Sequence, residues 1–121
     1  MIVILAEDLR RFEPIRAHLR ALGAPFTVMN AGQLAMDTSI VPQSKSHVVL
    51  YNRASPSSRA RGNDGAIDFA RFAIEWYDAQ GATILNGRRA LDLEASKATQ
   101  TVACARAGLR VPRTFAVHGN A

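Results

Sequence analysis

The sequence predicts an α/β fold built on a mainly parallel sheet of about four strands with flanking helices. Short apolar runs alternate along the chain with longer segments of helical periodicity, which is the pattern of repeated strand–helix units. The chain has 121 residues, of which 48% are hydrophobic, so it is long enough to bury the core of one domain. No internal repeat or low-complexity tract favours another architecture.

The predicted strands are short runs rich in apolar residues. The first, residues 2–5, is continuously apolar, as expected of a strand that is covered on both faces of a sheet. The others are residues 26–29, 47–51 and 82–86. Residues 30–46 contain Pro42 and several serines, which predicts a loop with at most a short edge strand.

Two helices are predicted between these strands. The first ends at about Leu22, just before Gly23, and has Pro14 in its first turn, where the missing N–H has no intrahelical partner to lose. The second follows a capping Asp64 and runs to about Gln80. Its apolar side chains recur at helical spacing and form one stripe, composed of Ile67, Ala70, Ile74 and Tyr77.

The remaining segments predict a loop, a third helix and the start of a strand. Residues 52–62 are polar and lack apolar periodicity, so they predict a loop. The third helix covers residues 93–107, with Lys97 near its start, and ends before a glycine. A further strand is predicted to begin near Thr114.

Composition excludes several classes of protein. The single Cys104 excludes an intrachain disulfide framework and a multi-cysteine metal site. No apolar run approaches the length of a membrane-spanning helix, and residues 1–6 are too short for a signal sequence, so we expect a soluble, cytoplasmic protein without a membrane partner. The net charge of +5 arises mainly from arginine, which suits either carboxylate or phosphate binding or an ordinary solvated surface.

Polar residues follow three of the predicted strands, where ligands bind in open α/β sheets. Glu7 and Asp8 follow the first strand and suggest the acidic pair of a phosphate-receiver domain. Asn52 stands where the phosphate-accepting aspartate of such a domain would be, so a working receiver is not expected, and Asp8 is better interpreted as a helix N-cap. No glycine-rich nucleotide-binding loop occurs in the chain.

The segment 52–62 and Lys97 are the remaining candidates. The segment combines three arginines with hydroxyl and amide groups, which could bind an anionic substrate such as a carboxylate or could form an exposed loop. Nucleic-acid binding is less favoured because base-stacking aromatic residues are lacking there. A lysine in the first turn of a helix opposes the helix dipole, so Lys97 either has a compensating ligand or partner or is a surface lysine.

The order of motifs over residues 47–118 resembles the N-terminal region of ATP-grasp ligases, in particular the RimK-type glutamate-ligase branch. Residues 1–46 resemble it only in general layout. The motifs that carry the resemblance are Asn52-Arg53 at a strand end, Ser55-Pro56-Ser57-Ser58, Gly81-Ala82 with Ile84-Leu85-Asn86, Glu94-Ala95-Ser96-Lys97, and Ala107-Gly108-Leu109 with Val111-Pro112-Arg113-Thr114.

The resemblance implies a three-layer, Rossmann-like pre-ATP-grasp domain over residues 1–110. Residues 111–121 would then be the linker and first strand of a catalytic domain that is absent. Family members activate a carboxylate with ATP and Mg²⁺ to an acyl phosphate, which an amine attacks. Lys97 would contact ATP, Asn52 and Arg53 would contact the substrate, and no catalytic residue is expected in this chain.

The partners implied are small-molecule or peptide carboxylate and amine substrates, with a homo-oligomer left open. By itself the 121-residue chain is not expected to catalyse ligation. The alternative is a non-catalytic α/β binding or regulatory module, either a degenerate receiver-like domain or a basic nucleic-acid-binding domain.

Overall fold

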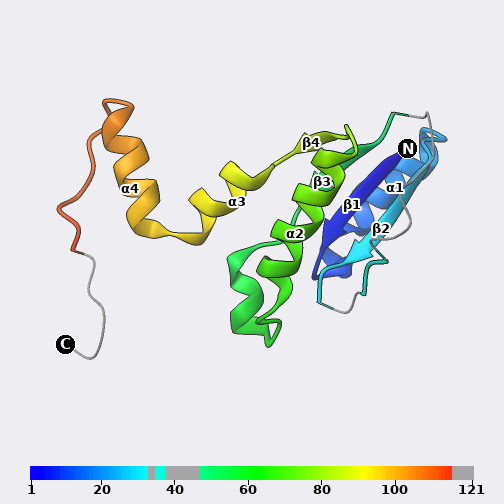
Figure 1. The fold of residues 1–121 in the computed structure, drawn as a ribbon, viewed down its shortest axis with the longest axis horizontal. Helices are drawn as coiled ribbons and strands as arrows, with labels where there is room; N and C mark the ends of the chain where they lie inside the picture. The colour runs from blue at the N-terminus through cyan, green and yellow to red at the C-terminus, as the bar shows by residue number, and fades with distance from the viewer. Residues whose placement is uncertain (33–34, 38–46, 116–121) are drawn as a thin grey trace.

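Four parallel strands form one sheet in the order β2-β1-β3-β4 (Figure 1). The computed structural model describes residues 1–32, 35–37 and 47–115. The strands are β1 (Ile2–Ala6), β2 (Phe26–Asn30), β3 (Val49–Asn52) and β4 (Thr83–Leu85). This confirms the predicted α/β class and the parallel sheet, and the strand order is consistent with a Rossmann-like fold.

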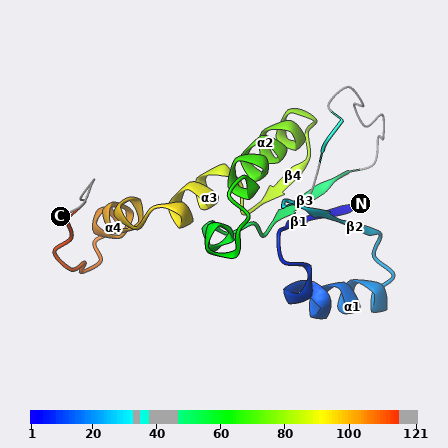
Figure 2. The same ribbon diagram turned by 90° about the horizontal axis from the view of Figure 1, so that it is seen from below.

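Helices cover the sheet on both faces, so the fold has three layers (Figure 2). The short 3-10 helix η1 and helix α1 lie on one face, and α2 and α3 lie on the other. A second 3-10 helix, η2, precedes α2, and α4 follows α3. Their bounds are η1 (Leu9–Phe12), α1 (Glu13–Ala21), η2 (Pro56–Arg61), α2 (Ala66–Ala79), α3 (Arg88–Ala95) and α4 (Lys97–Arg106).

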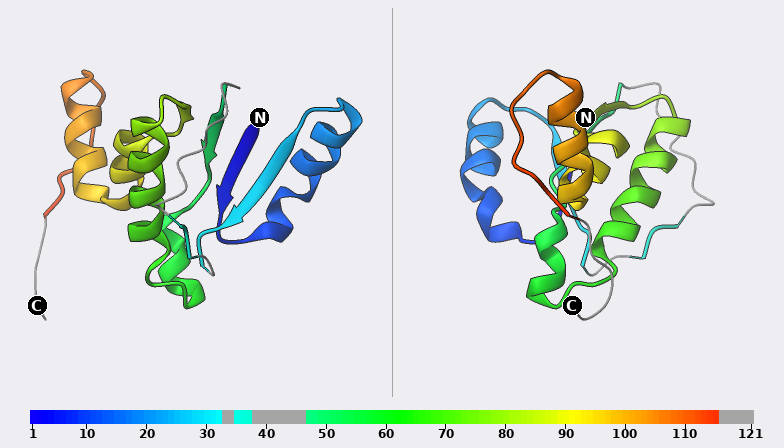
Figure 3. Two further views of the ribbon diagram at one scale, coloured as in Figure 1. Left: turned by 45° about the vertical axis from the view of Figure 1, so that its right-hand side comes forward. Right: turned by 90° about the vertical axis from the view of Figure 1, so that its left-hand side faces the viewer.

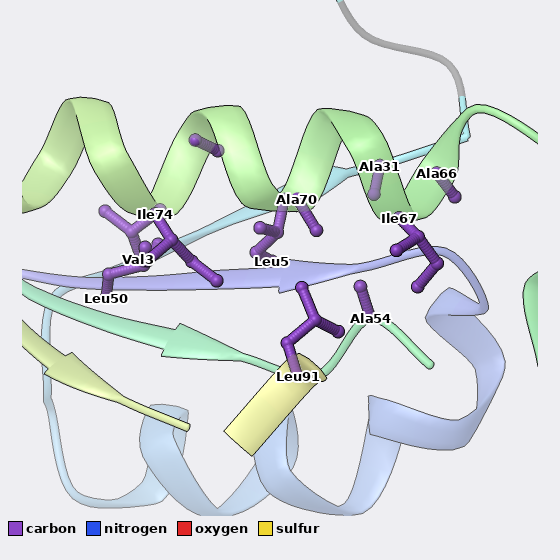
Figure 4. Packing of buried hydrophobic residues seen from close by; sticks show 11 residues of the cluster. Val3, Leu5, Ala31, Leu50, Ala54, Ala66, Ile67, Ala70, Ile74 and Leu91 are labelled. Carbon is purple, nitrogen blue, oxygen red and sulfur yellow. The ribbon is translucent and has the colours of Figure 1, made fainter. Parts of the chain in front are cut away.

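Strand β1 is the centre of both hydrophobic layers. It pairs with β2 on one edge and β3 on the other, so Ile2 lies opposite both Phe26 and Val49. Its side chains alternate between the two faces: Ile4 packs toward α1 with Phe12, and the larger cluster lies between the sheet and α2 (Figure 4). That cluster includes Val3, Leu5, Leu50, Ile67, Ala70, Ile74 and Leu91. Burial on both faces explains the continuous apolar run of residues 2–5.

The predicted third helix is wrong as one continuous element, because it is divided at Ser96. This residue has extended backbone angles, φ −133° and ψ 112°, and its side chain accepts a hydrogen bond from the Thr99 N–H at 3.2 Å. Serine favours this N-cap arrangement over a helix interior because its hydroxyl replaces a missing intrahelical partner. Helix α4 therefore begins at Lys97 and not at residue 93.

Three smaller predictions also need correction. The segment 52–62 is not entirely a loop, because Pro56 and the capping Ser55 side chain start η2. Gly65, and not Asp64, is the N-cap of α2. Residues 111–115 belong to no helix or strand, so the strand predicted near Thr114 does not begin within the described residues. The rest of that strand and most of the loop predicted over residues 30–46 lie outside them.

An ion-pair network joins α2 to α3. Arg71 donates hydrogen bonds to Asp92 at 3.0 and 3.1 Å and to Asp68 at 3.0 Å. The guanidinium of Arg88 binds the other oxygen of Asp92 at 2.9 Å and also pairs with Glu75. Asp92 thus connects two arginines, one from each helix, and fixes the orientation of α3 against α2.

This network predicts a pH-dependent contribution to stability. Desolvation raises the pKa of Asp92, but hydrogen bonds from Arg71 and Arg88 together outweigh it and hold that pKa below its ordinary value. A lowered folded-state pKa contributes stability above the unfolded-state pKa, and this is lost as the pH falls through the folded-state pKa. We expect Arg71→Gln to destabilise the protein at neutral pH and the difference from wild type to shrink on acidification. Urea unfolding at several pH values measures this difference.

The matched control for that measurement is Arg10→Gln. Arg10 is also an arginine, but its side chain is 95% exposed. Its ion pair with Asp8 is long, with 3.6 Å between Nε and Oδ1. Its replacement should leave the free energy of unfolding almost unchanged at every pH. A pH-independent effect of Arg71→Gln, or an equal effect of the control, would contradict the prediction.

Candidate functional site

The strand order changes direction between β1 and β3. From β1 the chain moves to β2 on one side, and it later returns to place β3 and β4 on the other side. Ligands of open α/β sheets bind at the carboxyl ends of the strands beside such a switch point. Arg53 is the first residue after β3, and its N–H donates a hydrogen bond to the Leu5 carbonyl of β1 at 2.7 Å. The backbone of Arg53 therefore lies beside the carboxyl end of β1.

A polar pocket of about 380 Å³ opens at this edge of the sheet. It brings together residues from η1, the end of β3, the end of β4 and α3. The polar lining residues are Arg11, Asn52, Arg53, Ser55, Asn86 and Glu94. The structure thus places both predicted substrate-binding residues, Asn52 and Arg53, in one pocket, and adds four polar neighbours that the sequence did not single out as site residues.

Arg53 and Arg11 are both exposed cations of this pocket, but only Arg11 has an ion-pair partner among the described residues. The guanidinium carbon of Arg53 lies 5.5 Å from the centre of the Phe12 ring and 5.7 Å from the centre of the Tyr51 ring. Such cation–π contacts hold the guanidinium in place without using its N–H groups. Within the part of the chain that the structure describes, no carboxylate pairs with Arg53. Its N–H groups are therefore free to bind an anion.

Asn52 has a different role, because its side chain is used within the fold. It is only 3% exposed. Its Nδ2 donates to the Asn86 carbonyl at 3.0 Å, and its Oδ1 accepts from the Ala54 N–H at 3.1 Å. In return, Asn86 Nδ2 donates to the Asn52 carbonyl at 3.2 Å. This reciprocal pair, the asparagine clasp, joins the ends of β3 and β4 and makes Asn52 a positioning residue.

Asn86 supports the clasp with an unusual backbone. Its φ of 55° lies in the left-handed region, which asparagine tolerates better than most residues. Among the described residues it is the only non-glycine with a positive φ. Left-handed backbone held by a hydrogen-bonded partner is common at ligand sites. The clasp therefore fixes the part of the pocket lining that Asn52 and Asn86 form.

The pocket also has an acidic side. Glu94 on α3 accepts a hydrogen bond from the Ser55 hydroxyl at 3.1 Å. Arg11 lies on the η1 side, where it pairs with Asp8 at 3.2 Å. A ligand in the pocket would thus meet the two arginines Arg53 and Arg11 as well as the carboxylate of Glu94.

The acidic residues after β1 are occupied by structural contacts. The Glu7 side chain is 3% exposed and pairs with Arg61. Asp8 is the N-cap of η1 and accepts from the Arg10 N–H at 3.3 Å, which confirms its interpretation as a helix cap. Within the described ranges, no group of three or more His, Cys, Asp or Glu side chains could hold a metal ion. Neither acidic residue is arranged as a receiver-type metal ligand.

Lys97 lies outside the pocket. It is the exposed first residue of α4, and its Nζ donates to the Gln100 side chain at 3.1 Å, which is an ordinary contact within one helix turn. The structure does not bring it together with Asn52 and Arg53 in the pocket.

The three arginines of segment 52–62 separate in space. Arg53 lines the pocket, Arg61 pairs with Glu7, and Arg59 lines a different hollow with Arg71. Among the described residues, Arg61 is therefore already ion-paired, whereas Arg53 has no carboxylate partner. No helix among the described residues has both the length and the apolar character needed to cross a membrane.

Neither a protein-family model nor a curated protein matches the sequence.

Proposed function

We propose that this chain is the N-terminal, substrate-side domain of an ATP-dependent carboxylate–amine ligase, and that Arg53 binds a carboxylate in the pocket at the carboxyl edge of the sheet. The proposal joins the motif resemblance to the geometry of the pocket. It assigns no catalytic residue to this chain, whose own part is to hold and orient the substrate.

The observation that carries the proposal is the state of the Arg53 guanidinium. It is held by two aromatic rings, has no carboxylate partner among the described residues, and lies at the switch point of the sheet. An arginine fork binds a carboxylate through two parallel hydrogen bonds, which fix both position and orientation. Asn86 lines the same pocket, and its Nδ2 keeps a second N–H beside the one donated to the Asn52 carbonyl, whereas the Ser55 hydroxyl is already hydrogen-bonded to Glu94.

Among the described residues, no group of three or more His, Cys, Asp or Glu side chains could hold a metal ion by itself. Lys97 is exposed, and its Nζ donates a hydrogen bond to the Gln100 side chain. The proposal assigns ATP and Mg²⁺ to a catalytic domain outside residues 1–121. When bound there they would supply phosphoryl activation of the carboxylate, and contact of Lys97 with ATP remains part of the proposal.

The test is binding of small carboxylates to the isotopically labelled chain, followed by NMR. We expect acetate, succinate and glutarate to shift signals of Arg53 and Asn86 saturably, with different affinities. Loss of a charge-assisted hydrogen-bonded pair costs about 1.5–3 kcal/mol. Arg53→Ala should therefore lower the affinity for the tightest-binding carboxylate by about 10- to 100-fold. Arg53→Lys should recover only part of the affinity because it lacks the planar fork.

Arg59→Ala is the matched control. It removes the same charge from the same segment but from outside the pocket, so affinity should stay near that of the wild type. Carboxylate binding that is unaffected by Arg53→Ala, or weakened equally by Arg59→Ala, would refute the assigned site.

A further inference from the structure

A groove of about 600 Å³ lies between α3 and α4. Figures 1 and 3 place α4 at the edge of the molecule, beyond α3 as seen from the sheet. Helix α4 has no buried residue, and Val102 on it is 52% exposed. Val102, Leu93 and Ala103 give the groove an apolar lining, to which α3 and α4 contribute the arginines Arg88, Arg89 and Arg106.

The charge of this groove is positive and largely uncompensated. Asp92 is its only acidic lining residue, and it is already bound by Arg71 and Arg88. In the described part of the chain, Arg89 and Arg106 have no carboxylate partner. An apolar lining flanked by free arginines fits an acidic partner that also carries a large apolar side chain.

The outer face of α2 has that chemistry. Asp68, Phe72, Glu75 and Asp78 are spaced by three or four residues and are all exposed, and together we call them the acidic stripe. Phe72 is 41% exposed, although its ring also contacts Phe69 at a centroid distance of 6.4 Å. Within the chain Asp68 pairs with Arg71 and Glu75 pairs with Arg88, so among the described residues Asp78 is the carboxylate of the stripe without an ion pair.

The groove and the acidic stripe lie on adjoining parts of one surface. Arg88, which lines the groove, pairs with Glu75 of the stripe, and Arg71 joins α2 to Asp92 in the groove. A surface with a basic apolar groove beside an acidic apolar helix face is complementary to itself. In a two-fold dimer, each copy presents its stripe to the groove of the other, so both contacts form together.

We propose that this chain forms a two-fold dimer in which the acidic stripe of α2 in one copy occupies the α3–α4 groove of a second copy. Phe72 packs on the apolar lining around Val102, and Asp78, which has no ion pair among the described residues, faces Arg89 and Arg106. The interface lies on α2, α3 and α4, and the dimer does not depend on carboxylate binding in the pocket.

A charge-reversal experiment tests the interface directly. One variant carries Arg89→Glu and Arg106→Glu, and the other carries Asp68→Lys and Asp78→Lys. In either variant alone both contacts of the dimer become repulsive, so its dissociation constant should rise at least about tenfold. In an equimolar mixture, the acidic groove of the first variant meets the basic stripe of the second, and the basic groove of the second meets the acidic stripe of the first.

Sedimentation velocity over a wide concentration range measures all three samples. We expect a dimer for the wild type, monomers for each variant alone, and a heterodimer for the mixture. The control variant, Arg10→Glu with Arg20→Glu, changes the net charge as much as the groove variant but lies on the α1 side of the sheet (Figure 2), and it should remain dimeric. Val102→Asp should also give monomers.

Three results would overturn the proposal. These are a wild type that stays monomeric throughout, variants that dimerise as well as the wild type, and a mixture that stays monomeric after each variant has dissociated. Circular dichroism of each variant confirms that it is folded, and Phe72→Ala provides a second, uncharged perturbation of the same contact.

Discussion

Replacing Leu91 with alanine is expected to lower the free energy of unfolding by about 2–5 kcal/mol. Leu91 is 1% exposed and is the residue of α3 that enters the core between the sheet and α2 (Figure 4). The truncation removes buried methyl groups and leaves a cavity that the strand ends around it cannot fill. Urea denaturation followed by circular dichroism measures the loss.

Two further variants show whether the burial of Leu91 is the cause of the lost stability. Leu91→Met keeps nearly the same volume and should cost less than about 1.5 kcal/mol. Leu93→Ala is the matched truncation on the same helix, but Leu93 is half-buried and lines the α3–α4 groove. Its unfolding free energy should change less than that of Leu91→Ala. Equal losses for Leu91→Ala and Leu93→Ala would mean that α3 is not anchored through Leu91.

The substitution Asn52→Asp should destabilise the protein by at least about 2 kcal/mol. A carboxylate has nearly the same shape as the amide, but it cannot donate to the Asn86 carbonyl and places a charge where the side chain is 3% exposed. The destabilisation should decrease as the pH falls, because a protonated carboxyl can donate again. Thermal and urea unfolding at several pH values follow this change.

Asn52→Ala separates the charge from the lost clasp. It removes both side-chain hydrogen bonds without burying a charge, so it should destabilise less than Asn52→Asp at neutral pH, and its effect should not depend on pH. If Asn52→Asp were as stable as the wild type, the asparagine clasp would not be holding β3 and β4 together.

The sheet could be predicted because its strands are encoded locally. Residues 2–5 are apolar without interruption, and the structure pairs them on both edges and covers them on both faces. The sequence also predicts that Arg53 lies at the carboxyl edge of the sheet, because a residue that directly follows a parallel strand lies at the carboxyl end of that strand. Gly23, Gly81 and Gly108 adopt positive φ after their helices, as expected for helix ends.

The contacts that complete the pocket could not be predicted, because they join residues far apart in the chain. In the sequence, nothing distinguishes Asn52 and Asn86 from other polar residues. They hydrogen-bond to each other only because β3 and β4 lie side by side in the sheet. Similarly, nothing in the local sequence of Glu7 indicates that Arg61 will pair with it. The division of the last helix at Ser96 was missed because its apolar spacing continues across the break, and only the serine itself marks an N-cap.

The position of β1 inside the sheet has a consequence for the synthesis of the protein. Strand β1 precedes both of its partners in the chain, and the register joins Ile2 to both Phe26 and Val49. One edge of this apolar strand therefore stays open during synthesis until β3 has emerged. Pairing β1 with β3 closes a longer loop than pairing it with β2, so the hydrogen-bonding groups on this edge of β1 are open to mispairing until β3 arrives.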